Sequence, residues 1–226
     1  MDRISKISYT RAVKRQFAIL SAGRTASTSL FRTLIETLQV RNAVFPIWDF
    51  SPADLLERAY AGDRFDYVLV KSETFHVLRH LRFRDRTTAI LLTRRDHLRQ
   101  IVSHLVALHS GRFRVERRAS PAKAEPVRIE RNEFLCVAHM VLMMEQFMRT
   151  ADLDGFDQVE RWAYEDLVAD FPFHLRKLGV DKPRIAQARG VAYDFSTVLN
   201  MDEVLGWAEA LRGEGLRVPK QATLCA

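Results

Sequence analysis

One stretch decides the fold of this chain: FAILSAGRTASTSL, residues 17–30. It begins with an uninterrupted apolar run at 17–20 and passes through a short, hydroxyl-rich turn. Beyond the turn, apolar side chains recur at the spacing of one helix face. They are Leu30, Phe31, Leu34, Ile35 and Leu38. The pattern predicts a buried strand that leads through a tight turn into an amphipathic helix.

A turn of this kind is typical of an anion site. The first backbone N–H groups of a helix have no partner within the helix, and the helix dipole favours negative charge there. The side chains at this position are Arg24, Thr25, Ser27 and Thr28. We expect them to enclose a phosphate group; the alternative without a ligand is a capped helix start with a solvated arginine.

The amino-acid sequence of the turn narrows the range of ligand classes that it could bind. It lacks the G-x-x-x-x-G-K-[ST] pattern of the common ATP-binding loop, and it lacks the three glycines of a dinucleotide site. The sequence therefore disfavours ATP and NAD.

Strand-like apolar runs alternate with helical patterns along the rest of the chain. The runs lie at 17–20, 67–70, 89–93 and 158–162, and the helical patterns at about 28–39, 97–109, 133–149 and 166–178. This alternation predicts an α/β fold with a central parallel sheet flanked by helices in three layers. The candidate ligand residues follow the ends of these runs, where open α/β sheets bind ligands.

A second arginine-rich turn follows the run at 89–93. Arg94 and Arg95 come directly after it, and Ser103 lies eight residues beyond Arg95 on the predicted helix. Two helical turns bring Ser103 back toward the strand end, and a dianionic phosphate needs a fixed cation and a neutral donor. If the arginines instead form a solvated helix face, Ser103 is an ordinary helical serine.

Three segments of the chain, these two turns and a third stretch that begins at Tyr164, resemble the sulfotransferases that use 3′-phosphoadenosine 5′-phosphosulfate (PAPS) as donor. The first turn is similar to the family's 5′-phosphosulfate loop, which corresponds here to Gly23, Arg24, Thr25, Ala26, Ser27, Thr28 and Ser29. Arg95 and Ser103 match the pair that binds the 3′-phosphate. Tyr164, in the stretch YEDLVADFP, matches the tyrosine near the adenine. Glu165 and Asp166 are interpreted as acids at a helix start.

Within the superfamily, the segment RRDHLRQIVS at 94–103 is most similar to small bacterial carbohydrate sulfotransferases of the Nod-factor and trehalose type. The resemblance implies a P-loop-like fold, PAPS as donor, 3′-phosphoadenosine 5′-phosphate (PAP) as product, no metal, and a carbohydrate or glycolipid hydroxyl as acceptor. A small lipid or secondary-metabolite hydroxyl is the alternative acceptor. A non-catalytic PAP-binding protein and a nucleotide kinase are the rival functions.

Three positions depart from the family pattern. Gly23 stands where the family often has proline, and Ala26 stands where it usually has glycine. A methyl group at Ala26 is tolerable if its φ is negative and awkward if it is positive. Ser29 replaces the tryptophan that packs on adenine in the cytosolic steroid and phenol enzymes, which favours a polar acceptor.

The resemblance also implies roles in catalysis. Arg24 would stabilise the bridging and leaving oxygens, and because it stays charged it would act by electrostatics alone. Lys71 matches a lysine found after a strand in many relatives and would hold the sulfuryl group or the acceptor. The identity of the catalytic base remains open: Asp49 is the first candidate, Glu73 and His76 are its rivals, and Glu36 is a distant fourth.

Composition bounds the remaining possibilities. The net charge of +7, from 35 basic and 28 acidic residues, includes a basic run at 79–86, but no stacking-aromatic or zinc motif accompanies it, so we expect an anionic donor rather than nucleic acid. Cys136 and Cys225 give neither a metal-site spacing nor a disulfide framework.

We expect one domain over residues 1–226, with a mobile loop at 110–132 that lacks either periodicity. No apolar stretch reaches the length of a membrane span or follows the pattern of a signal peptide, so the expected location is the cytoplasm. The sequence leaves the oligomeric state open.

Overall fold

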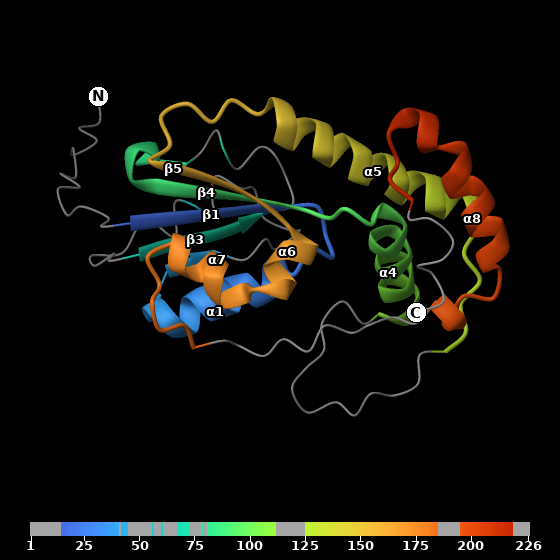
Figure 1. Ribbon diagram of the computed structural model, residues 1–226, viewed down its shortest axis with the longest axis horizontal. Helices are drawn as coiled ribbons and strands as arrows, with labels where there is room; N and C mark the ends of the chain where they lie inside the picture. Colours follow the sequence, from blue (N-terminus) through green and yellow to red (C-terminus); the bar gives the residue numbers. More distant parts are fainter. Residues whose placement is uncertain are drawn as a thin grey trace, which may run out of the picture.

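The computed structural model describes residues 15–40, 42–44, 67–72, 81–111, 125–184 and 195–218, together with Leu56, Tyr60 and Leu78. Its centre is a five-stranded sheet in the order β2-β3-β1-β4-β5 (Figure 1). All four strand pairs are parallel. The strands are β1 (Arg15–Ser21), β2 (Asn42–Val44), β3 (Tyr67–Ser72), β4 (Thr87–Thr93) and β5 (Gln158–Ala163). The prediction of a parallel α/β sheet is confirmed.

The two central strands are apolar on both faces because helices cover both. Along β1, Phe17 and Ile19 lie on one face, and Ala18 and Leu20 lie on the other. Strand β4 repeats this alternation, as expected for strands in the middle of a parallel sheet. The continuous apolar runs of the sequence are therefore a consequence of two-sided burial.

The helices form the outer layers. On one face, α1 (Ser27–Leu38), α6 (Tyr164–Ala169) and α7 (Phe171–Lys177) pack on the sheet, and on the other face lies α5 (Arg131–Thr150) (Figure 1). The side chains that α1 contributes are Leu30, Phe31 and Leu34, the stripe expected from the sequence. The molecule thus has the three layers of a helix–sheet–helix fold.

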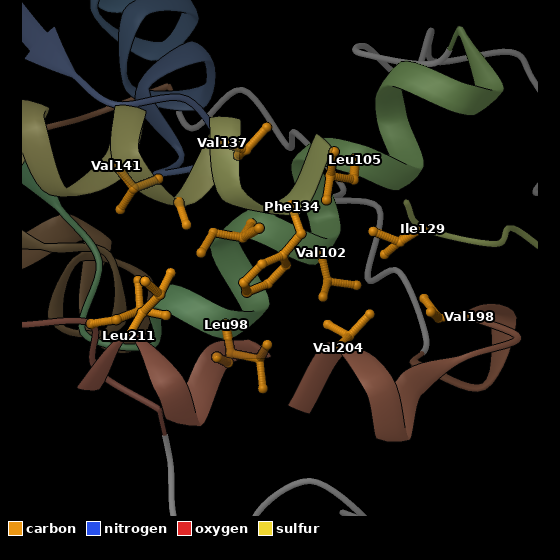
Figure 2. Packing of buried hydrophobic residues seen from close by; sticks show 14 of the residues in the cluster. Leu98, Val102, Leu105, Ile129, Phe134, Val137, Val141, Val198, Val204 and Leu211 are labelled. Carbon is orange, nitrogen blue, oxygen red and sulfur yellow. The ribbon is translucent and has the colours of Figure 1, made fainter. Parts of the chain in front are cut away.

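A separate apolar cluster extends the molecule beyond the carboxyl ends of the strands. It joins α4 (His97–Ser110), α5 and α8 (Met201–Ala210) around the buried ring of Phe134 (Figure 2). Leu98, Val102 and Leu105 line the α4 side of this cluster. The packing holds the first turn of α4 next to the ends of β1 and β4, where the candidate ligand residues lie.

Several boundaries differ from the sequence prediction. The helical pattern at 166–178 is two helices, because Asp170 has a non-helical backbone and caps α7, whose second residue is Pro172. Strand β2 and helix α8 were not predicted. In the predicted loop at 110–132, Ser110 belongs to α4 and Arg131 starts α5, while residues 112–124 lie outside the described part. Among the described helices, none has the length and apolar character needed to cross a bilayer.

Candidate functional site

The turn between β1 and α1 has a strained backbone. Arg24 and Ala26 both adopt left-handed conformations, with φ of 66° and 59°. Such angles are uncommon for residues with a side chain and cost of order 1–3 kcal/mol each where the surrounding structure holds them. Ala26 thus has the positive φ at which its methyl group is awkward. Strain of this kind concentrates at ligand sites.

This backbone leaves the start of α1 without a side-chain cap. Ala26 is the N-cap residue, and in the part of the chain that the structure describes the first turn has no side-chain cap. The first N–H groups of a 12-residue helix are therefore available to an anion, and left-handed residues in a turn help to aim successive N–H groups at one point. The alternative of a capped helix start therefore does not describe this turn, as far as the described residues show.

Two buried hydroxyls in and before the turn also lack protein partners. Within the described residues, neither Ser21 Oγ nor Thr25 Oγ1 makes a hydrogen bond, and both residues are fully buried. Leaving a buried hydroxyl unpaired costs about 1–3 kcal/mol, so such groups call for a ligand or water. Ser27 is buried as well, whereas Thr28 and Ser29 are partly exposed.

Helix α4 contacts this turn with two side chains. Arg24 Nε donates a hydrogen bond of 2.8 Å to Ser103 Oγ, across 79 residues of sequence. Gln100, one helical turn earlier, donates from Nε2 to the Gly23 carbonyl at 2.9 Å. The structure therefore brings together the two segments that the sequence singled out separately.

Arg94 brings the third segment to the same place. Its NH1 group donates to the Arg24 carbonyl at 3.2 Å, and its guanidinium lies over the Tyr164 ring at 4.4 Å from the centroid. Glu165 Oε1 lies 3.9 Å from Arg94 Nε. Burial lowers the pKa of Arg94 below its usual value, and the negative charges of neighbouring acids oppose this shift in part.

Arg95, the predicted partner of Ser103, points to other residues. Its NH1 and NH2 groups donate to the two carboxylate oxygens of Asp166, at 2.8 and 2.5 Å. Its backbone N–H and that of Asp96 donate to the Glu165 carboxylate. Glu165 thus accepts hydrogen bonds from backbone N–H groups at the start of α4. Its place in the sequence indicates only an acid at the start of its own helix and does not predict this role.

The remaining predicted residues divide into two groups. Lys71 is buried at the carboxyl end of β3, in register with Ile19 of the neighbouring β1. Glu36 is exposed near the end of α1, far along the helix from its first turn. Asp49, Glu73 and His76 lie outside the described residues, so the three main candidates for the base keep their status as predictions.

A paired polar cluster lies behind the β4–α4 turn. Fully buried His97 has its Nε2 atom 3.1 Å from Glu145 Oε1, and its Nδ1 atom accepts the Arg217 backbone N–H at 3.1 Å. The Arg217 guanidinium contacts Glu145 and donates to the Arg94 carbonyl at 3.0 Å. The segment around Arg217 therefore holds the turn that contains Arg94 in place through these hydrogen bonds and ion pairs.

Together these residues form a candidate anion site at the carboxyl edge of the sheet. Uncapped N–H groups, unpaired hydroxyls and two arginines meet at the end of β1, which suits a phosphate or sulfate group. Sequence reasoning missed Arg94, Gln100 and Glu165, although Arg94 and Gln100 lie inside the motif that identified Arg95. Comparison of the chain with protein-family models and with curated protein sequences finds no match.

Proposed function

We propose that this protein is a PAPS-dependent sulfotransferase that transfers a sulfuryl group to an acceptor hydroxyl, most suitably one on a carbohydrate or glycolipid. The observation that carries the proposal is the hydrogen bond from Arg24 to Ser103. It joins the turn that resembles the 5′-phosphosulfate loop to the segment that resembles the 3′-phosphate site.

The ligand class follows from the groups that meet there. The donor carries a phosphosulfate at one end of its adenosine and a phosphate on its ribose, so it needs cations and neutral donors from more than one segment. The β1–α1 turn offers uncapped N–H groups and buried hydroxyls, the segment after β4 offers an arginine guanidinium, and α4 offers the hydroxyl of Ser103. Tyr164, beside Arg94, offers an aromatic ring next to both turns.

The reaction needs positioning and charge stabilisation more than covalent chemistry. The acceptor oxygen forms a bond to sulfur while the bond from sulfur to the bridging phosphate oxygen breaks, and PAP leaves. Arg24 would stabilise the negative charge that develops on the leaving oxygens. A base, for which Asp49, Glu73 and His76 are the candidates, would accept the acceptor's hydroxyl proton, and Lys71 would contact the sulfuryl group or the acceptor.

Calorimetry with the purified protein tests the donor class. We expect PAP to bind and ATP not to bind, because the turn lacks the common ATP-binding pattern. Binding of ATP but not PAP would favour the kinase. Turnover is then measured with radiolabelled PAPS against sugars, glycolipids, small lipids and phenols; labelling of phenols alone would refute the carbohydrate acceptor.

An Arg24→Ala variant separates a transferase from a PAP-binding protein without turnover. Removing a charge that stabilises the transition state lowers kcat by about 100- to 1,000-fold. The matched control is Arg86→Ala, since Arg86 lies at the opposite end of β4, roughly 20 Å away along the strand, and is paired with Asp85. Equal activity in both variants would remove Arg24 from the reaction, and a wild-type protein that binds PAP without turnover on any acceptor would be a sensor.

A further inference from the structure

Two adjacent arginines follow β4, and the sequence cannot say which one faces a ligand. The spacing of eight residues to Ser103 selects Arg95. Neighbouring residues in a turn point in different directions, however, so one of the two is directed to the candidate site and the other away from it. Their contacts and exposure separate them.

Arg95 has its hydrogen-bonding capacity committed at the surface. Its side chain is 60% exposed, and both ends of its guanidinium fork are matched to the two oxygens of Asp166. A fork paired with a carboxylate in this way makes the same two parallel bonds that it would make to a phosphate. To bind the donor, Arg95 would have to leave Asp166.

Arg94 has the opposite properties. Its side chain is 12% exposed, and it reaches the Arg24 carbonyl in the strained turn. Its buried Nε atom makes no hydrogen bond within the described residues, since Glu165 lies at 3.9 Å, beyond hydrogen-bond distance. A buried guanidinium with an unused donor next to uncapped helix N–H groups and the unpaired Thr25 hydroxyl is suited to a bound anion.

Glu165 is placed to hold this arrangement. Its carboxylate accepts the backbone N–H groups of Arg95 and Asp96, which fixes it against the start of α4. From there it faces Arg94 Nε on one side, while the Tyr164 ring packs on the Arg94 guanidinium. The carboxylate and the ring together limit the rotamers open to Arg94.

We infer that Arg94, not Arg95, is the cation that the second turn contributes to the bound donor, and that Glu165 is its positioning residue. Arg95 instead ties the turn to α6 through Asp166. The inference rests on the proposed function for the identity of the donor, but the choice between the two arginines applies to any phosphate-bearing ligand of this site.

The test compares the same substitution at adjacent positions, Arg94→Gln and Arg95→Gln, with PAP affinity measured by calorimetry and folding by urea denaturation. Removing a charge-assisted phosphate contact weakens PAP binding by about 10- to 100-fold in Arg94→Gln. Arg95→Gln is expected to change the Kd by less than about threefold. Arg94→Lys keeps the charge without the planar fork and should fall between the wild type and Arg94→Gln. An equal or larger loss in Arg95→Gln would overturn the inference.

Glu165→Gln tests the positioning role. If this carboxylate merely repelled the donor, its neutralisation would tighten PAP binding; as a positioning residue, its loss weakens binding severalfold. In the Arg94→Gln background the same change should then have no further effect, because Glu165 acts through Arg94. Tighter binding in Glu165→Gln, or an equal loss in both backgrounds, would reject the positioning role.

A parallel series with inorganic pyrophosphate separates the two proposals. If the wild type binds pyrophosphate but not PAP, and Arg94→Gln alone weakens that binding, the proposed function fails while the assignment of Arg94 stands. If the wild type binds neither, both fail. If PAP binds and the two arginine variants lose equal affinity, only the assignment of Arg94 fails.

Discussion

The two ends of the central strands both carry buried polar groups, but they differ in how completely those groups are paired. At the amino end, Gln16 donates to the Tyr60 hydroxyl at 2.8 Å and accepts from Thr87 at 3.3 Å. Thr87 also donates to the Phe83 carbonyl, and the Arg82 N–H donates to Tyr60. Burial raises the pKa of Tyr60, so its hydroxyl remains neutral in this network.

At the carboxyl end the pairing is incomplete. Ser21 Oγ, Thr25 Oγ1 and Arg94 Nε are buried and have no hydrogen-bond partner within the described residues. The turn that contains Thr25 is also strained, whereas the strands leading into it are regular. The contrast teaches that a buried polar network with every group paired stabilises the fold, and that unpaired groups beside strained backbone mark a place for a ligand.

The largest effect expected from this comparison is on stability, at the amino end. Gln16→Leu removes both of its hydrogen bonds and leaves Tyr60 and Thr87 with fewer partners, which lowers the free energy of unfolding by about 1–3 kcal/mol. Urea denaturation measures this loss, and the Kd for PAP should stay within about twofold of the wild type.

The control for Gln16→Leu is Gln146→Leu on the exposed side of α5, where the same change should alter stability by less than about 0.5 kcal/mol. If Gln16→Leu instead weakened PAP binding tenfold while stability held, the distinction between the two ends would fail.

A smaller effect is expected for Glu145→Gln, which tests whether pairing or location matters. Glu145 lies near the carboxyl edge, but its partners are His97 and Arg217. Burial alone would raise the pKa of Glu145; the hydrogen bond from His97 and the positive charge of Arg217 outweigh burial and hold the pKa below its usual value of 4.5. Glu145→Gln should therefore lower stability by about 1–2 kcal/mol near pH 7 and change the PAP Kd less than threefold.

The sign of the pH dependence follows from the lowered pKa. The carboxylate contributes its full stability above the unfolded-state value of 4.5, and this contribution is lost as pH falls through the lower folded-state pKa. Denaturation curves at a series of pH values should thus show a gap between wild type and Glu145→Gln that is widest at neutral pH and closes in acid. A gap that widens in acid would contradict the assignment, and Glu209→Gln in an exposed ion pair should give little gap at any pH.

The smallest expected effect concerns the strained turn itself. Ala26→Gly removes a Cβ from a residue with φ of 59°, so it should raise the free energy of unfolding by about 0.5–1 kcal/mol. The control is Ala208→Gly inside α8, where glycine should lower stability by about 1 kcal/mol. Thermal unfolding of both variants shows whether each substitution raises or lowers stability. A loss of stability in Ala26→Gly would show that the turn carries no strain.

Much of the fold could be predicted because burial leaves a direct mark on the sequence. The runs that became β1 and β4 are apolar on both faces, and the stripe on α1 has helical spacing. Parallel topology then places the ends of these strands at one edge, which is why Arg24 and Ser103 could be expected near each other. Strand β2, with only three residues, is too short for any periodicity to identify it.

Details of the site could not be predicted, because distant residues decide them. Arg94 and Arg95 are chemically identical neighbours, and their directions depend on Tyr164 and Asp166, about 70 positions further along the chain. Positive φ angles at Arg24 and Ala26 run against the preferences of both residue types, so no local signal indicates them. The division between α6 and α7 did have a local signal, because Pro172 marks a helix start, although the apolar spacing at 166–178 runs across it.

The register of β1 against β4 has a consequence for how this molecule tolerates change. Ser21 pairs with Leu92, so the two turns leave adjacent strands at nearly the same height. Deleting one residue from β4 would draw Arg94 back by about 3.3 Å and turn it toward the opposite face of the sheet. The lengths of these two strands therefore set the distance between the two turns that would contact a bound molecule. Insertions are better accommodated in surface connections than in either strand.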